Sequence, residues 1–235
     1  MSGGLELERA SFRYGELWVL REATLSVPKG GTLLVTGDNG VGKSTLLYVC
    51  AGLLPASSGR VLLDGHAPSV ARPSDLFRSG VRRGFVFYGG GLLSNTTALG
   101  NVTLALRYHA DVLGLDDAAI DARARELLAE LRVAQTDFHA LPAHLSVGVR
   151  RRVSLARALA LAPNFLFFDD PDANLDAASK RLVYDLLERF RDDASVTLVL
   201  TTTSRELIER LGVPYRELAH GYLLGRGFSI TPAVG

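Results

Sequence analysis

The sequence predicts an α/β protein in which a mostly parallel sheet carries helices on both faces. Several apolar runs of strand length are separated by stretches with helical periodicity. Buried runs that alternate with helices are typical of parallel strands joined by crossover helices. The N-terminal stretch predicts an antiparallel β edge, and helix formers dominate the middle of the chain. We therefore expect one domain over residues 1–235, with an α-helical subdomain at 89–160 inserted within it.

Strands are expected where short apolar or alternating runs end at turn residues. Leu5–Ser11 alternates between apolar and polar side chains, and Ala23–Val27 precedes a proline–glycine turn. An Asp-Gly pair after Val61–Leu63 indicates a hairpin. The other expected strands are the apolar runs Thr32–Thr36, Gly84–Tyr88, Phe165–Phe168 and Val196–Leu200.

Helices are expected where apolar residues recur every three or four positions. Asp117–Arg132 shows this pattern most clearly, because its leucines and alanines fall on one face. Another helix opens near Lys43, directly after a glycine-rich loop. Val149–Leu161 is expected to be helical up to the proline that follows, and Ala177–Phe190 links two buried strands. These helices supply the crossovers that a parallel sheet requires.

The composition excludes several classes of protein. With 47% apolar and 22% charged residues, the chain resembles an ordinary globular protein, and its net charge of +1 gives no general attraction to nucleic acid. A single cysteine, Cys50, excludes an intramolecular disulfide. No segment reaches the ~18 uninterrupted apolar residues of a membrane span, and the N-terminus lacks a secretory pattern. We expect a soluble protein that meets a membrane only through a partner.

The loop after Thr32–Thr36 predicts phosphate binding. It matches the pattern G-x-x-x-x-G-K-[ST], with a buried strand before it and a helix after it. Glycines allow consecutive N–H groups to turn toward phosphate oxygens, and the helix N-terminus favours negative charge. Lys43 would neutralise the β- and γ-phosphates of ATP, and Ser44 would ligate Mg²⁺. The expected nucleotide-binding residues are Gly37, Asn39, Gly40, Gly42, Lys43, Ser44 and Thr45.

A carboxylate follows the apolar run Phe165–Phe168. Asp169 lies at the carboxyl end of this expected strand, which is where ligands of open α/β sheets bind. Oxygen ligands suit Mg²⁺, which usually keeps several of its waters. Asp169 is therefore the second expected Mg²⁺ ligand, through a water molecule.

Three further segments resemble the ATP-binding cassette (ABC) family, the motor domains of membrane transporters. Leu145–Val149, which reads Leu-Ser-Val-Gly-Val, and the basic helix after it are similar to that family's signature loop and helix. Asn174–Asp176 is similar to its D-loop, and Tyr14 matches the aromatic residue that stacks on adenine. The resemblance covers nearly the whole chain and implies a P-loop NTPase core.

The resemblance implies a dimer in which each ATP lies between two subunits. Ser146 and the N–H of Gly148 would contact the γ-phosphate of the ATP on the partner's phosphate loop. Arg150–Arg152 would form a solvated helix face without a role in nucleic-acid binding. The implied partners are a second ABC ATP-binding subunit, identical or not, and transmembrane permease subunits. The implied place is the cytoplasmic side of the bacterial inner membrane, with membrane contact only through the permease.

Four positions depart from the family's pattern at elements that serve hydrolysis. Val147 replaces the first glycine of the signature. Asp170 replaces the glutamate that activates the attacking water, on a side chain shorter by about 1.5 Å. Thr203 replaces the switch histidine, and a hydroxyl carries no charge near neutral pH. Tyr88 occupies the place of the Mg²⁺-sensing glutamine, and a phenol is a poor Mg²⁺ ligand.

These departures predict retained ATP binding with hydrolysis that is slow or absent, or that follows an unconventional route. Asp170 and Thr203 are the candidate catalytic residues at the altered positions. The leading hypothesis is the ATP-binding subunit of a bacterial membrane transporter. The alternative is a regulatory or structural module that closes on ATP without appreciable turnover. Residues 99–109 also faintly resemble ATPases of MCE-associated lipid transporters.

Overall fold

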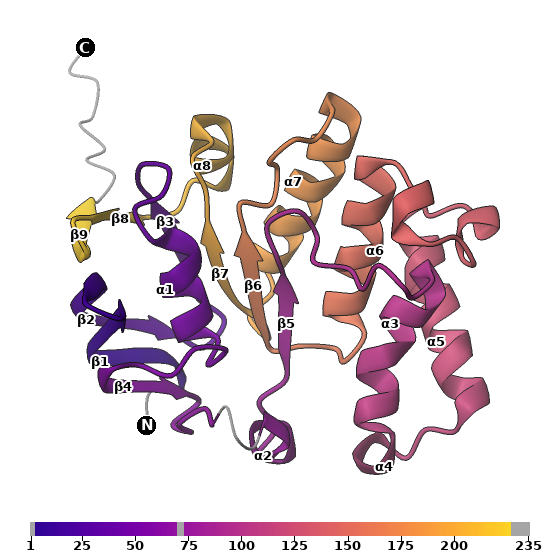
Figure 1. Cartoon of the computed structure of the whole chain (residues 1–235), viewed down its shortest axis with the longest axis horizontal. Helices are drawn as coiled ribbons and strands as arrows, with labels where there is room; N and C mark the ends of the chain where they lie inside the picture. Colours follow the sequence, from indigo (N-terminus) through magenta and orange to yellow (C-terminus); the bar gives the residue numbers. More distant parts are fainter. Residues whose placement is uncertain (1–2, 70–72, 227–235) are drawn as a thin grey trace.

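A computed structural model describes residues 3–69 and 73–226 of the chain. Within these ranges the main sheet has six strands in the order β5-β6-β7-β3-β8-β9 (Figure 1). All neighbouring pairs are parallel except β8–β9, which confirms the predicted, mostly parallel sheet. The strands are β3 (Thr32–Thr36), β5 (Arg83–Val86), β6 (Phe165–Asp169), β7 (Thr197–Thr201), β8 (Tyr215–Ala219) and β9 (Tyr222–Arg226).

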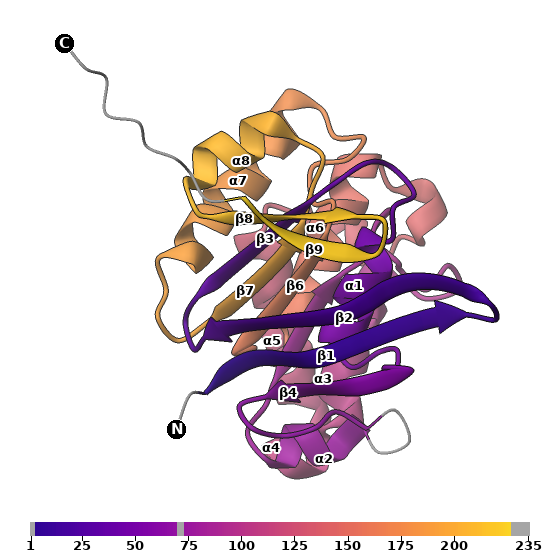
Figure 2. The ribbon, with the colours of Figure 1, turned by 90° about the vertical axis from the view of Figure 1, so that its left-hand side faces the viewer.

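The N-terminal strands form a separate antiparallel sheet in the order β2-β1-β4. These strands are β1 (Gly4–Tyr14), β2 (Leu17–Pro28) and β4 (Ser58–Leu63). Figure 2 looks onto this sheet, with β8 and β9 of the main sheet above it. The predicted antiparallel edge is therefore a second sheet, because the N-terminal strands pair with one another and pack through Leu5 and Leu7 into the core that contains α1.

Helices α3, α5 and α6 pack together at one end of the main sheet (Figure 1). Each of these helices begins after a side chain that accepts a hydrogen bond from a backbone N–H of the first turn, which stabilises the helix start. The helices of the described chain are α1 (Lys43–Cys50), α2 (Pro73–Arg78), α3 (Ala98–Tyr108), α4 (Ala110–Leu113), α5 (Asp117–Glu130), α6 (Val147–Leu159), α7 (Ala177–Arg191) and α8 (Arg205–Leu211).

The main sheet separates two hydrophobic cores. Along β6, Phe165 and Phe167 point into the core shared with α1 and the antiparallel sheet, whereas Leu166 and Phe168 point into the core shared with α3, α5, α6 and α7. All four side chains are almost completely buried. This two-sided burial explains why the strand is a continuous apolar run. Consequently α1 and α6, which carry the two expected phosphate contacts, lie on opposite faces of the sheet.

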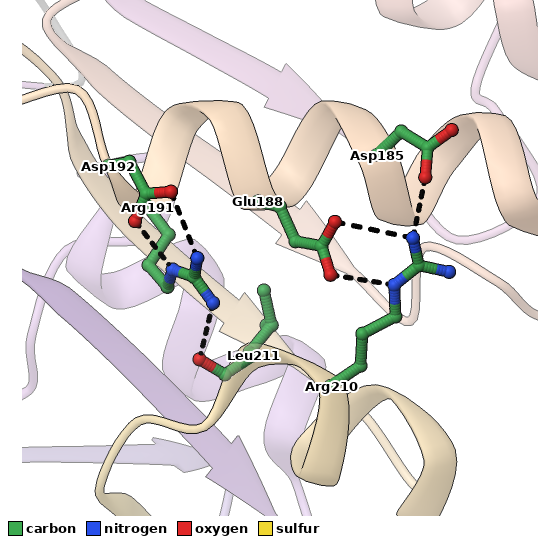
Figure 3. Close-up of polar contacts among 6 residues, drawn as sticks. All are labelled: Asp185, Glu188, Arg191, Asp192, Arg210 and Leu211. Carbon is green, nitrogen blue, oxygen red and sulfur yellow. Dashed lines mark hydrogen bonds and ion pairs between the residues drawn. The ribbon is translucent and has the colours of Figure 1, made fainter.

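A network of ion pairs joins α7 to α8 (Figure 3). Arg210 on α8 donates to Glu188 at 2.7 Å and to Asp185 at 2.5 Å, both on α7. Arg191 donates to the carbonyl of Leu211 at 2.9 Å. The side chain of Arg210 is one-third exposed, so these pairs fix the relative position of the helices and add only modestly to stability.

Candidate nucleotide-binding site

The phosphate loop connects β3 to α1, as its pattern predicts. Gly37, Gly40 and Gly42 all have positive φ angles, of 146°, 79° and 105°. Gly42 is also confined by space, because a Cβ atom on it would lie 2.3 Å from Cγ1 of Val19. Both its backbone angle and its packing therefore exclude a side chain. Asn39 and Gly40 are exposed at the tip of the loop, while Thr45 is buried in α1.

Lys43 is the first residue of α1 and turns back across the loop. Its Nζ donates to the carbonyl oxygens of Gly37 and Asp38, at 2.8 Å in each case. Burial lowers the pKa of this ammonium group, against the attraction of Asp170 and Asp169. A lysine ammonium has three donors, so one remains for a ligand in the loop. This geometry suits a phosphate oxygen.

Asp169 ends β6 and lies beside Ser44. The Ser44 hydroxyl donates to Asp169 Oδ1 at 3.0 Å, which brings the two expected Mg²⁺ ligands together. The sequence did not predict two other hydroxyls here: Thr201 donates to the same carboxylate at 2.9 Å and Tyr48 at 3.4 Å. Asp169 is 2% exposed. Buried oxygens in this arrangement fit a hard divalent cation, which Ser44 and Asp169 would hold.

Asp170 points into the same site from a left-handed backbone position with φ of 47°. Burial and the nearby Asp172 raise the pKa of its carboxyl group, and the backbone N–H of Thr203 and the Lys43 ammonium partly offset this increase. Thr203 thus lies beside Asp170, and the contact is made by its main chain. Thr203 itself is an exposed residue.

A buried hydrogen-bond network holds the loop that carries Thr203. The Tyr184 hydroxyl donates to Asp172 at 2.6 Å and lies 3.3 Å from the Ser204 hydroxyl. Ser204 in turn accepts a hydrogen bond from Leu207 at the start of α8. This network ties the loop after β6 to the loop after β7, so the two candidate catalytic positions are fixed relative to each other.

The raised pKa of Asp170 predicts how stability depends on pH. The folded-state pKa lies above the ordinary value of 3.8, so the folded protein bears an electrostatic cost whenever Asp170 is ionised. This cost is full at neutral pH, shrinks as the pH falls through the folded-state pKa, and disappears below the unfolded value. We expect Asp170→Asn to raise the melting temperature by a few degrees at pH 7.5 and by much less near pH 4, as measured by differential scanning calorimetry. An equal gain at both pH values would contradict this origin.

Tyr14 lies at the end of β1 with 52% of its surface exposed. Its ring meets Phe12 edge to face, with 4.8 Å between the ring centroids, and about half of the side chain is open to a ligand. Offset or stacked contact with a flat base is a common use of such a ring. This geometry is compatible with the predicted adenine contact.

The signature loop precedes α6. Ser146 is the N-cap residue, and its hydroxyl accepts from the Val149 N–H at 3.2 Å. The helix therefore begins at Val147, two residues before the predicted start. A Cβ atom on Gly148 would lie 2.5 Å from the Ser179 hydroxyl, so a side chain at this position would force that hydroxyl to move. Val147 is 48% exposed and fits the fold without strain.

Three side chains of α6 hold the glycine-rich loop that follows β5. The expectation that Arg150–Arg152 forms a solvated face is wrong for Arg151, which is 5% exposed. Arg151 lies on the inner face of α6, where its guanidinium reaches a backbone carbonyl instead of water. The contacts run from Arg151 to the carbonyl of Phe87 at 3.1 Å, from Ser154 to Gly90 at 2.7 Å, and from Arg157 to Gly91 at 2.8 Å and Gly90 at 3.2 Å.

Tyr88 lies within this tethered loop and is 55% exposed. Its hydroxyl accepts from the side-chain amide of Asn174 at 3.4 Å, which links the loop to the D-loop segment before α7. The sequence did not predict the role of Arg151, although this cation stands at an inward position of an amphipathic helix. Such a position normally demands a specific partner.

Among the helices of the described ranges, none is both long and apolar enough to span a bilayer.

Comparison with known proteins identifies the family. Residues 20–173 match the family described as ABC transporter. LolD of Geobacter metallireducens, a lipoprotein-releasing system ATP-binding protein, is 36% identical over 219 residues, which is 90% of this chain and 94% of LolD. MetN of Photorhabdus laumondii, a methionine import ATP-binding protein, is 36% identical over 206 residues, or 87% of this chain, but the match spans only 58% of MetN.

The fold also matches a solved structure. A dimeric ATP-binding cassette, MJ0796 bound to ADP and Pi, superposes with a TM-score of 0.83 at 26% identity, covering 93% of this chain and 96% of that one. ABC cassettes bind ATP with Mg²⁺, which suits the phosphate loop and the Ser44–Asp169 pair described above. The chain therefore belongs to the ABC transporter family, as one of its ATP-binding cassettes.

Proposed function

We propose that this chain is the ATP-binding subunit of a bacterial membrane transporter, that it binds Mg-ATP at a dimer interface, and that its own hydrolysis is weak. One contrast carries the proposal. The phosphate loop and the Ser44–Asp169 pair are complete, whereas Asp170 and Thr203 replace the groups expected to move a proton. Loss of a general base alone costs about 10²–10⁴-fold in rate.

Each residue of the site has a proposed task. Lys43 and the loop N–H groups bind the phosphates, and Tyr14 stacks on adenine. Ser44 and Asp169 hold Mg²⁺, whose charge offsets that of the phosphates when it is bound. Asp170 receives the proton of the attacking water with poor geometry, and Thr203 donates one neutral hydrogen bond.

The second half of each site is proposed to come from a partner cassette. Within one chain, α1 and α6 lie on opposite faces of the main sheet, and Val147 in the signature loop is 48% exposed, so this loop is open to contact by another molecule. Ser146 is exposed beside the N-terminus of α6, which favours an anion. The partner is a second copy of this chain or a related cassette, and MJ0796 supports this proposal because its structure is dimeric.

The helical segment at 89–160 is proposed to be the subdomain that contacts permease subunits at the cytoplasmic face of the inner membrane. The names of MetN and LolD, which refer to import and lipoprotein release, support such a setting. The similarity to LolD extends along nearly its whole length, and the faint resemblance of residues 99–109 to ATPases of MCE-associated lipid transporters points the same way. Both points favour a lipid-bearing cargo.

The dimer proposal is tested by light scattering after gel filtration, with and without Mg-ATP. Slow hydrolysis should let Mg-ATP itself hold the dimer, and we expect Val147→Asp to weaken it about tenfold or more, because a carboxylate would face the partner's phosphates. Val112→Asp is the matched control, since Val112 is 44% exposed and lies on α4. A chain that stays monomeric in saturating Mg-ATP would contradict the homodimer and leave a heterodimer to be tested.

A regulatory module that closes on ATP without turnover is the second candidate. The four replaced positions favour it. A complete absence of ATP turnover would distinguish it from a slow ATPase.

A further inference from the structure

An open surface cavity of about 370 Å³ lies where α5, α6 and α7 meet, outside the nucleotide site. Four arginines line it: Arg132 from the end of α5, Arg152 from α6, and Arg181 and Arg189 from α7. Two acidic residues, Glu130 and Asp185, also line it. The whole chain has a net charge of only +1, so this is a local concentration of positive charge.

The four arginines of the cavity outnumber its two carboxylates. Asp185 already accepts a hydrogen bond from Arg210, and its carboxylate points toward that residue (Figure 3). Within residues 3–69 and 73–226, no hydrogen bond or ion pair joins the side chains of Arg181 or Arg189 to another residue. By contrast, Arg191 at the C-terminal end of α7 and Arg210 on α8 are both paired. Unpaired guanidinium groups around a concave surface favour an anionic ligand.

One wall of the cavity is held by hydrogen bonds from Arg152. Arg152 donates to the carbonyl of Arg132 at 2.7 Å and to the carbonyl of Gly148 at 3.3 Å. These bonds hold its guanidinium at the cavity while leaving donors unused. Arg132 has a left-handed backbone with φ of 56°, so the bond to its carbonyl also fixes the turn that ends α5.

The lining is not entirely polar. Leu182 lines the cavity as a half-buried side chain, and Leu131 and Leu186, which are 7% and 8% exposed, each add an apolar edge; all three belong to or pack against the core under α6 and α7. A small inorganic anion would leave this surface in contact with water. An anionic group joined to an apolar chain would satisfy both parts of the cavity.

The cavity also adjoins the signature loop. Ser179 lines it, and the hydroxyl of Ser179 is the atom against which Gly148 packs. The carbonyl of Gly148 is held by Arg152, another lining residue. A ligand in the cavity would therefore contact two groups that set the position of the signature loop.

We propose that this arginine-lined cavity is a binding site for an amphiphilic anion, in which the guanidinium groups bind a phosphate or carboxylate head and the three leucines contact its alkyl chain. The site lies apart from the phosphate loop, and it does not depend on whether the chain hydrolyses ATP. Occupancy would restrain the junction of α5, α6 and α7 next to the signature loop.

Isothermal titration calorimetry on the full chain tests the proposal with four probes below their micellar concentrations. Octyl phosphate and octanoate carry an anionic head, and the two together distinguish a phosphate from a carboxylate. Octyl glucoside keeps the alkyl chain but has a neutral head, and inorganic phosphate lacks the alkyl chain. We expect at least one of the two anionic probes to bind. Octyl glucoside and inorganic phosphate should each bind at least tenfold more weakly than that probe.

Variants then locate the binding. Arg181→Glu and Arg189→Glu alter side chains without partners, so the fold should be kept. Each substitution should weaken the binding of the anionic probe about tenfold or more. Lys180→Glu is the matched control, because it makes the same charge change on α7 at a residue that does not line the cavity. Absence of binding by both anionic probes, equal binding of inorganic phosphate, or an equal effect of the Lys180 variant would overturn the proposal.

Discussion

Replacing Lys43 with alanine is expected to weaken ATP binding on the order of a hundredfold. The ammonium group now donates to the carbonyls of Gly37 and Asp38, and in the complex it would donate to phosphate oxygens. Charge-assisted hydrogen bonds are worth about 1.5–3 kcal/mol each, and a hundredfold change corresponds to about 2.7 kcal/mol. The remaining loop N–H groups and Tyr14 account for the residual binding.

Fluorescence titration with an ATP analogue measures this effect. Lys180→Ala is a suitable control, since Lys180 lies on α7 and outside the phosphate loop. Thermal unfolding of both variants separates a local effect from a loss of the folded protein. If Lys43→Ala bound ATP as tightly as the unaltered chain, the assignment of the nucleotide site would be wrong.

The combined substitution Asp170→Glu and Thr203→His is expected to raise steady-state ATP turnover by about 10²–10⁴-fold. The glutamate extends the carboxylate by one carbon toward the attacking water, and the histidine supplies a group that can be charged near neutral pH. The hydrogen-bond network of Asp172, Tyr184 and Ser204 positions both loops already, so the new groups enter an ordered site.

Phosphate release at saturating Mg-ATP provides the measurement. Adding Asp169→Asn to the double variant should abolish the gain, because the Mg²⁺ carboxylate is then lost. Fast turnover by the unaltered chain would refute the proposal of weak hydrolysis. Absence of turnover in the unaltered chain, together with the Mg-ATP dimer, would favour the regulatory module over a slow ATPase.

The sequence predicted those parts of the fold that have a strong local signal. The buried run Phe165–Phe168 forms β6 because its side chains are buried on both faces, and the glycine loop before Lys43 connects β3 and α1 as its spacing requires. Asp169 and Ser44 could be paired because parallel strands end at the same edge. Here local pattern and tertiary structure agree.

Other features had weak local signals. In β8 only Leu218 is buried, so Tyr215–Ala219 shows no apolar run and its strand was not predicted. The hydroxyl of Thr201 reaches Asp169 through the register of β6 and β7, which no single segment reveals. Arg151 was expected in water because it stands in a row of arginines, and its burial depends on a carbonyl 64 residues away in the sequence.

The tether between α6 and the glycine-rich loop has a consequence for how this cassette can change over evolution. Arg151, Ser154 and Arg157 bind main-chain oxygens, which every residue type provides. The path of the loop is therefore independent of the side chain at position 88. A tyrosine can occupy that position while these main-chain contacts hold the loop, so the chemistry presented at position 88 can be exchanged by one substitution while the scaffold is inherited unchanged.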